Sequence, residues 1–228
     1  MATLKQGKNC ETCEVRKENV FCDIPKAGIA VLNESKITNV FKRGHYVFYE
    51  GNFPSGLYCV NGGVVKLETS GPNGHNHILR MVHAGGMLGY RSLFSEEPYR
   101  ASALVHEEAT ICFIPKGAII RLIETYPNVA IHFLSRVSRE LRQAEGRFCG
   151  LTDKNAGERI AESLLFLKDN FPEQIWTRKE IAEWAGTTPE TVMRTLSEFE
   201  ETGLIEQTGR IIKLKNKSAL IEMANLTL

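Results

Sequence analysis

The N-terminal arm, residues 1–24, carries cysteines at a spacing that suits metal binding. Cys10 and Cys13 form a C-x-x-C pair, and Cys22 follows after eight intervening residues. Iron–sulfur clusters are held by thiolates in sets of four, and thiolates also hold tetrahedral zinc. Inert, unligated cysteines are the alternative. The arm has no apolar segment typical of a secretory signal, so the cytoplasm is the expected compartment, where disulfides are rare.

A second set of residue types is suited to reading DNA bases. Glu190 and Arg194 are four residues apart and would share one face of a helix. An arginine can donate to both O6 and N7 of guanine, and a glutamate can accept from N4 of cytosine. A surface salt bridge between the two side chains is the alternative interpretation.

The sequence around this pair has the pattern of a helix-turn-helix. Thr177 and Glu180 are spaced as a capping box at the start of a first helix. Gly186 supplies the positive φ of a tight turn. Thr188 and Pro189 are suited to the N-cap and first position of a second helix. Because the start of the second helix enters the major groove, the pattern predicts duplex DNA as the partner.

The expected DNA contacts come from both helices. Thr187 and Thr188 are expected to cap the helix and to contact phosphates. Trp184 is expected to lie in the hydrophobic core. The predicted DNA-binding residues are Arg178, Lys179, Thr187, Thr188, Pro189, Glu190, Met193 and Arg194.

The region 152–228 is predicted to be a winged helix. A helix over about 156–170 precedes the motif, and two short β runs around Thr208–Gly209 indicate a hairpin. From 155 to 228 there are nine Lys/Arg and twelve Asp/Glu, so the net charge is 9 − 12 = −3. Attraction to phosphates must therefore come from a local patch. Its candidate residues are Arg178, Lys179, Arg194, Arg210, Lys213 and Lys215.

The remaining chain predicts a sheet domain followed by one long helix. Residues 25–125 contain short alternating runs separated by glycines, which is typical of a β-sandwich or barrel. Residues 126–151 carry apolar side chains at alternating spacings of 3 and 4, and we interpret this seam as a dimer interface rather than intradomain packing. The seam consists of Leu134, Val137, Leu141, Ala144, Phe148 and Leu151, flanked by charged residues that include Arg136 and Glu140.

The sequence gives no indication of a membrane protein or of an enzyme. Hydrophobic residues make up 43% of the chain and charged residues 24%, with a net charge of +1, which is ordinary for a globular protein. No apolar run is long enough to span a membrane. There is no G-x-S-x-G, no P-loop and no paired-carboxylate arrangement, so an enzyme is not expected.

The order of these parts resembles the Crp/Fnr family of bacterial transcription regulators. The strongest patches lie at 85–103, 154–164 and 177–205. The resemblance implies an α+β fold: an N-terminal double-stranded β-roll of the jelly-roll, cyclic-nucleotide-binding kind, a dimerisation helix and a C-terminal winged helix. It also implies a homodimer on a palindromic DNA site and RNA polymerase as a partner. Glu190 and Arg194 match the family's reading of a GA-containing half-site, whereas Met193 stands where the oxygen-responsive branch commonly has serine.

The resemblance also places an effector pocket in the β-roll. Tyr90 stands where the cyclic-AMP branch has its ribose-binding glutamate, and Ala101 replaces the phosphate-binding serine. The adenine-binding Thr-Ser pair is replaced by Ala144-Glu145. Cyclic AMP is therefore not expected, and Arg100 either holds another anion or pairs with a nearby glutamate (Glu96 or Glu97). The pocket residues are Gly89, Tyr90, Arg100, Ala101 and Ser102.

By the same resemblance, Cys112 falls at the fourth-ligand position of the oxygen-sensing branch. This implies an iron–sulfur cluster on Cys10, Cys13, Cys22 and Cys112, although the gap before Cys22 is longer than the family's. Zinc stays open as an alternative. The leading prediction is a transcription regulator that responds to a redox or gas signal. The second prediction is a regulator that responds to a small-molecule effector or to haem in the β-roll.

Other candidate ligands are less specific. Cys59 is expected in the core, and Cys149 is either core or a spare thiol. His75 and His77 flank a turn and are candidates for a metal site. Candidate axial ligands for haem are His45, His83 and His132.

Overall fold

A computed structural model describes residues 3–4, 9–72 and 74–225. The chain forms two compact units. The first comprises 1–69 with 79–142, and the second 70–78 with 143–228. No helix within the described residues combines the length and the apolar character that a membrane crossing requires.

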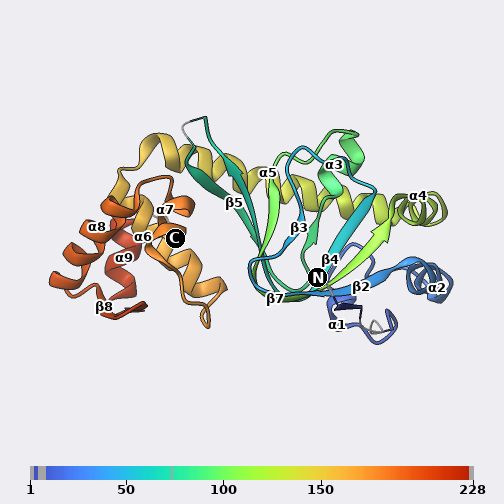
Figure 1. The fold of residues 1–228 in the computed structure, drawn as a ribbon, viewed down its shortest axis with the longest axis horizontal. Coiled ribbons are helices and arrows are strands. Elements are labelled where there is room, and N and C mark those ends of the chain that lie inside the picture. The colour runs from blue at the N-terminus through green and yellow to red at the C-terminus, as the bar shows by residue number, and fades with distance from the viewer. Residues whose placement is uncertain (1–2, 5–8, 73, 226–228) are drawn as a thin grey trace. The chain divides into compact units, whose positions relative to one another are not determined.

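The first unit is built on an antiparallel sheet whose described part has seven strands (Figure 1). The strands are β1 (Thr3–Leu4), β2 (Ile37–Phe41), β3 (Tyr46–Phe48), β4 (Gly56–Ser70), β5 (Asn76–Val82), β6 (Met87–Leu88) and β7 (Ser102–Pro115). β7 pairs with β2, β3 and β4, while β5 and β6 pair with β4. The predicted fold class is confirmed by this sheet and by the helices that follow.

The two longest strands bend where a glycine permits it. The register between β4 and β7 shifts between Val60 and Val65, as bulges do when they curl a sheet. Gly63 lies there with φ of +81°, and a Cβ on it would come within 2.2 Å of the carbonyl oxygen of Glu108. Only glycine fits this close approach of two strands.

Helices cover the sheet and supply one of its two cores. They are α1 (Glu14–Lys17), α2 (Lys26–Ser35), α3 (Tyr90–Ser95), α4 (Lys116–Thr125) and α5 (Asn128–Asp153). One core lies among the strands and includes Val60, Leu88 and Val105. The other joins the arm and helices to the sheet, and it includes Phe21 and Phe133.

The second unit has the predicted winged-helix elements (Figure 1). They are α6 (Ala156–Asn170), α7 (Arg178–Ala185), α8 (Pro189–Glu201), β8 (Ile205–Thr208), β9 (Ile211–Leu214) and α9 (Lys217–Met223). β8 and β9 form the expected antiparallel hairpin. Side-chain caps begin the helices: Asn155 and Thr177 each form a capping box, with Glu158 and Glu180 respectively.

The helix α5 runs from the first unit into the second. It is the helix expected over 126–151, beginning and ending two residues later. Its predicted seam is exposed along its length: the exposed fraction is 63% for Leu134, 56% for Leu141 and 67% for Phe148. Exposed apolar residues at heptad spacing are a surface that water does not favour and that a second helix can cover.

Candidate functional site

The helix α8 presents a short polar face at its start. Thr188 caps it, because its hydroxyl accepts from the backbone N–H of Thr191 at 3.3 Å, and Pro189 follows at the first helical position. Val192 and Leu196 are buried against the domain core. Glu190, Met193 and Arg194 are therefore left on the outer face, and all three side chains are exposed.

Glu190 and Arg194 are not paired with each other. No ion pair joins them among the interactions of the described residues. Hydrogen bonds from its own backbone amide and from Thr188 lower the pKa of Glu190, so it is a carboxylate at neutral pH. The arrangement leaves a carboxylate and a guanidinium exposed and unpaired with each other on one helix face.

Arg178 has a local role that sequence reasoning missed. Its guanidinium donates to the side-chain oxygen of Gln207 at 2.5 Å, and to the carbonyl oxygens of Gly209 and Arg210 at 3.3 Å each. These acceptors lie on the β8–β9 hairpin, so Arg178 fastens the first helix of the motif to the wing. The long-range hydrogen bonds gave no local signal in the sequence.

The rest of the predicted basic patch is divided between paired and unpaired cations. Lys179 lies 3.8 Å from a carboxylate oxygen of Glu183, and Lys215 lies 3.3 Å from one of Glu206. Within the described part of the chain, no ion pair engages Arg194 or Arg210. Thr187 is partly exposed, and its backbone amide donates to Ala182 at the helix turn.

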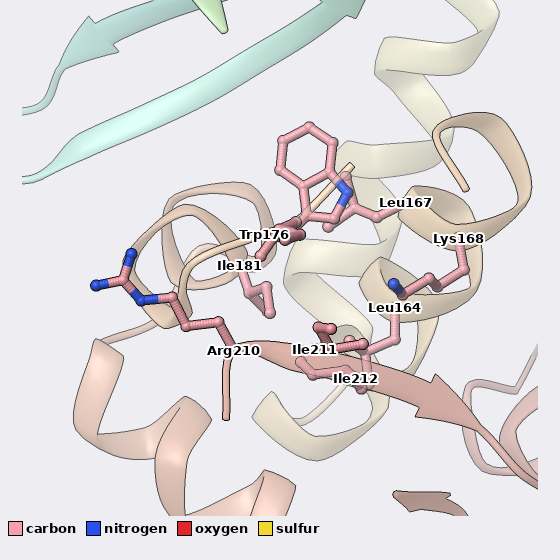
Figure 2. A pocket seen from close by; sticks show the side chains of 9 residues that line it. Leu164, Leu167, Lys168, Trp176, Ile181, Arg210, Ile211 and Ile212 are labelled. Atoms are coloured by element: carbon pink, nitrogen blue, oxygen red, sulfur yellow. The ribbon is translucent and has the colours of Figure 1, made fainter. Parts of the chain in front are cut away.

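Two features behind the motif are structural. Trp184 is half-buried, with its ring stacked on Phe166 at 4.7 Å and the Arg147 guanidinium 4.1 Å from its centroid. A small apolar pocket lies between α6 and the wing (Figure 2). Its lining residues are Leu164, Leu167, Lys168, Ile175, Trp176, Ile181, Arg210, Ile211 and Ile212. None of these carries a carboxylate, an imidazole or a thiol, so the pocket offers no acid–base or metal chemistry.

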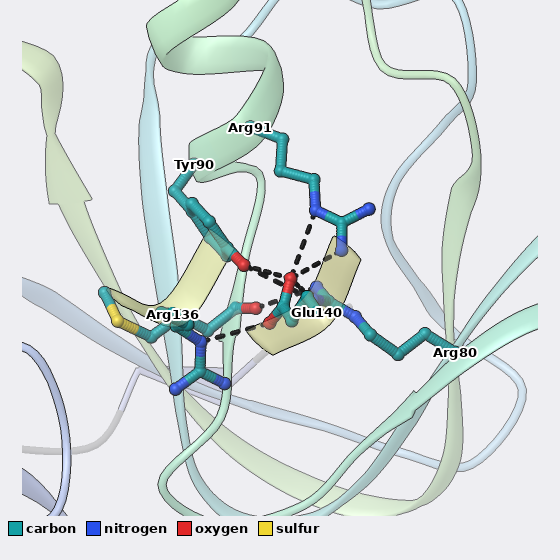
Figure 3. A network of polar contacts seen from close by, with 6 residues as sticks. Arg80, Tyr90, Arg91, Arg136 and Glu140 are labelled. Atoms are coloured by element: carbon teal, nitrogen blue, oxygen red, sulfur yellow. Dashed lines mark hydrogen bonds and ion pairs between the residues drawn. The ribbon is translucent and has the colours of Figure 1, made fainter. Parts of the chain in front are cut away.

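The position expected for a ribose-binding glutamate holds a buried polar network instead. Tyr90 has no exposed surface, and its hydroxyl donates to the carboxylate of Glu140 on α5. The same carboxylate pairs with Arg80 on β5 and, at 2.6 Å, with Arg91 on α3. Arg136, one turn earlier on α5, lies 3.2 Å from its other oxygen. Figure 3 shows these side chains converging on Glu140 from three elements.

The network keeps Glu140 ionised in spite of its burial. Burial by itself raises the pKa of the Glu140 carboxyl, but the charge of Arg80 and hydrogen bonds from Tyr90 and Arg91 outweigh it and lower that pKa. Sequence reasoning had placed Arg136 and Glu140 among the charged flanks of the seam. No local pattern indicated that Glu140, only 8% exposed, would turn inward.

The other predicted pocket residues do not converge. Arg100 is exposed, and Glu96 pairs with Lys116 at 2.9 Å, not with Arg100. Ala101 is buried, while the hydroxyl of Ser102 accepts from the backbone amide of Glu50 at 3.0 Å. Gly89 has φ of +81° and begins α3, where a Cβ would press on the Tyr99 ring at 3.3 Å.

Four thiols gather where the arm meets the sheet, and we call them the four-thiol group: Cys10, Cys13, Cys59 and Cys112. Cys59 and Cys112 face each other across β4 and β7. Burial raises the pKa of Cys59, and the neighbouring thiols of Cys112 and Cys10 raise it further. Cys10 and Cys59 thus belong to one core cluster with Cys112 packed against it, as expected for Cys59, and Cys13 is near enough to raise the pKa of Cys59.

Polar groups surround these thiols. The Lys36 ammonium donates to the Cys10 sulfur at 3.1 Å, and the Thr38 hydroxyl lies 3.4 Å from the Cys112 sulfur. Burial raises the pKa of Cys112, although Thr38 and Lys36 act in the opposite direction. Without a bound cation, Cys59 and Cys112 are neutral thiols at physiological pH.

The fourth predicted ligand, Cys22, has different neighbours. Its sulfur lies 3.8 Å from Nε2 of His132, and that nitrogen lies 2.9 Å from a carboxylate oxygen of Asp23. Among the described residues, these three form a group that could hold a metal ion, because their ligand atoms all lie within 4.8 Å of one another. The remaining candidate ligands, His45, His75, His77, His83 and Cys149, are half-buried or exposed and do not join them.

Two family models match separate parts of the chain. Residues 38–126 match the family model described as a cyclic nucleotide-binding domain. Residues 158–223 match the one described as a Crp-like helix-turn-helix domain. Residues 89–102 fall inside the first match, and α8 falls inside the second.

Similar proteins span nearly the whole chain. It is 27% identical over 217 residues to a CRP-like cAMP-activated global transcriptional regulator of Mycobacterium tuberculosis, covering 91% of this chain and 97% of that one. It is 28% identical over 196 residues to the fumarate and nitrate reduction regulatory protein of Escherichia coli, and the match covers 82% of this chain and 78% of that protein. A Crp/Fnr-type regulator structure from Eubacterium rectale has a TM-score of 0.78 at 17% identity, covering 90% and 97%, which shows the shared fold.

Proposed function

Because the chain belongs to the Crp/Fnr family of DNA-binding transcription regulators, we propose that it is a homodimer that reads a palindromic site and responds to a redox or gas signal. The observation that carries the reading role is the outer face of α8, where Glu190 and Arg194 are exposed and unpaired with each other. In this proposal Arg194 donates to guanine and Glu190 accepts from cytosine. Thr187, Thr188 and Lys179 contact phosphates.

The exposed seam of α5 supports the homodimer. Leu134, Leu141 and Phe148 would be covered by the same residues of a second copy, in the manner of a two-stranded coiled coil. By the resemblance to the family, such a dimer would present its two recognition helices to successive major grooves, about 34 Å apart. Such a dimer acts in the cytoplasm, beside RNA polymerase.

The four-thiol group supports the redox signal. Four thiolates are the donor set of an iron–sulfur cluster, and the raised pKa values of Cys59 and Cys112 mean that a cation must displace their protons. The donor set therefore fits such a cluster, with Cys10, Cys13 and Cys112 as ligands and Cys59 at the fourth place instead of Cys22. The cluster, when bound, supplies the chemistry that reacts with oxygen or nitric oxide.

Cyclic AMP is not the proposed effector. Tyr90 aligns with the ribose-binding glutamate of the cyclic-AMP branch, and its hydroxyl donates to Glu140, which also pairs with Arg80 and Arg91. The named activity of the mycobacterial relative is therefore not carried over. The second candidate, a small molecule or haem in the β-roll, would have to displace this network or use Arg100, which is exposed.

The decisive experiment is anaerobic purification followed by DNA binding before and after exposure to air. We expect coloured protein with iron and sulfide in proportion, which shifts a palindromic duplex with GA-containing half-sites. Air should bleach the colour and weaken the shift. Cys112→Ser should lack the colour, and Cys149→Ser, an exposed thiol on α5, is the matched control. The redox role would be refuted if the protein were colourless and iron-free and if neither air nor the Cys112→Ser substitution changed its DNA binding.

A further inference from the structure

Cys22, Asp23 and His132 bring three different ligand types to one point. Cys22 and Asp23 lie between α1 and α2, and His132 lies in the first turns of α5. We propose that they form a mononuclear site for a divalent transition-metal ion of the zinc class, separate from the four-thiol group. The proposal does not depend on which signal the protein senses.

The separations of the ligand atoms are close to those that such an ion imposes. With usual bond lengths to sulfur, nitrogen and oxygen, a tetrahedral zinc ion spaces S and N by about 3.6 Å and N and O by about 3.3 Å. The corresponding separations are 3.8 Å for Cys22–His132 and 2.9 Å for His132–Asp23. These two separations differ from the tetrahedral values by a few tenths of an ångström, and the Cys22 sulfur and the Asp23 oxygen also lie within 4.8 Å of each other.

The backbone on both sides of the site is already fixed. Phe21 and Phe133, each the neighbour of a ligand, are buried and pack edge to face with ring centroids 6.1 Å apart. The Arg16 guanidinium donates to the carbonyl oxygens of Phe21 at 2.9 Å and Cys22 at 3.1 Å. Ligands on a backbone held this way lose little freedom when an ion binds.

The ligand chemistry selects the ion. One thiolate and one imidazole favour zinc-class ions over magnesium or calcium, which take oxygen ligands. A single thiolate does not suit an iron–sulfur cluster, which needs four. Asp23 has a side chain 63% exposed, so water can complete a fourth position.

Asp23 also explains why a cation is favoured. A thiolate and a carboxylate beside one imidazole repel each other unless a cation lies between them. The bound ion would tie the arm to α5 one residue from Ile131, which is 59% exposed, and two from Leu134 of the seam.

The test is metal binding by the full-length protein after chelation. Zn²⁺ affinity is measured by competition with a chromophoric chelator, and Co²⁺ is used to detect a thiolate-to-metal charge-transfer band. Cys22→Ser and His132→Gln should each weaken Zn²⁺ binding at this site at least about 100-fold, and Asp23→Asn about 10-fold, since loss of even an outer-shell partner costs 10–100-fold. The Co²⁺ band should vanish in Cys22→Ser.

Control variants separate this site from the four-thiol group. Cys112→Ser and Cys149→Ser should keep the ion, while Cys112→Ser alone loses iron and sulfide. The circular dichroism spectrum and the thermal unfolding of each variant, measured on the same preparations, report whether it is folded. Zn²⁺ should raise the melting temperature of the wild type but not of His132→Gln. The proposal is overturned if the wild type does not bind Zn²⁺, if folded His132→Gln binds it normally, or if Cys112→Ser loses it together with Cys22→Ser.

Discussion

Glu140 and Glu190 are both carboxylates with a lowered pKa, yet their surroundings are opposite. Glu140 is buried and held by Tyr90 and three arginines. Glu190 is exposed, and its carboxylate accepts hydrogen bonds from its own backbone amide and from Thr188. The network around Glu140 therefore uses its polar groups within the protein, whereas the outer face of α8 presents them to solvent.

This difference teaches how to separate stability from recognition in the molecule. Substitutions in the internal network should change the free energy of unfolding and leave the DNA bases that are read unchanged. Substitutions on exposed faces should change association and leave the unfolding of the protein nearly unchanged.

Glu140→Ala should have the largest effect on stability. It leaves the Arg80 and Arg91 charges partly buried without their carboxylate, and breaking a buried pair from one side costs about 3–5 kcal/mol. Urea unfolding measures the loss. Glu145→Ala, at an exposed position on the same helix, is the control and should cost less than about 0.5 kcal/mol. Equal losses in the two variants would contradict the network's role.

Leu141→Glu should disrupt association without unfolding the protein. The side chain is 56% exposed in one copy, so a glutamate is tolerated there, but it places two carboxylates on the proposed seam. Losing a leucine buried at the interface costs about 2–5 kcal/mol. Sedimentation should show monomers, and binding to a palindrome should fall. A dimeric Leu141→Glu protein would show that another surface joins the copies.

Arg194→Ala should cost about 1–3 kcal/mol of affinity at the specific site and relax the preference at one base pair. Mobility-shift titration on a set of half-site variants measures both effects. Lys179→Ala is the matched comparison, because a phosphate contact weakens binding to all sequences alike. If Arg194→Ala also weakened all sequences equally, Arg194 would be a phosphate contact.

The pH dependence of unfolding should distinguish the two glutamates. Since the pKa of Glu140 is lower in the folded protein than its unfolded value of about 4.3, its ionisation stabilises the fold above that pH. This contribution is lost as the pH falls through the folded-state pKa. Glu140→Gln should therefore flatten the acid side of the stability profile, whereas Glu190→Gln, at an exposed position, should change it little. Identical acid profiles for the wild type and Glu140→Gln would count against the network.

Arg178→Ala should have the smallest effect, about 1 kcal/mol or less on unfolding, because its hydrogen bonds to the wing are partly exposed. Faster hydrogen exchange at the β8–β9 amides would report the loosened wing. Lys213→Ala, exposed on the same hairpin, should leave that exchange unchanged. Unaltered hydrogen exchange in Arg178→Ala would show that the β8–β9 hairpin is stable without the hydrogen bonds from Arg178.

Local patterns were sufficient for the DNA-binding half of the protein. Caps such as Thr177 and Thr188, the left-handed turn at Gly186 and the wing hairpin depend on neighbours a few residues away, so the sequence shows them directly. The apolar seam of α5 is visible for the same reason, because helical periodicity is a local property.

The N-terminal part of the chain depended on contacts between distant segments. Glu140 meets a tyrosine 50 residues away, Cys59 faces Cys112 only because β4 pairs with β7, and Cys22 reaches His132 across 110 residues. Charge patterning along α5 suggested an exposed Glu140, and spacing alone grouped Cys22 with Cys10 and Cys13. In this part of the chain, strand register and helix packing decide which side chains share a site. Register and packing depend on burial of the whole core, so no short stretch of sequence reveals them.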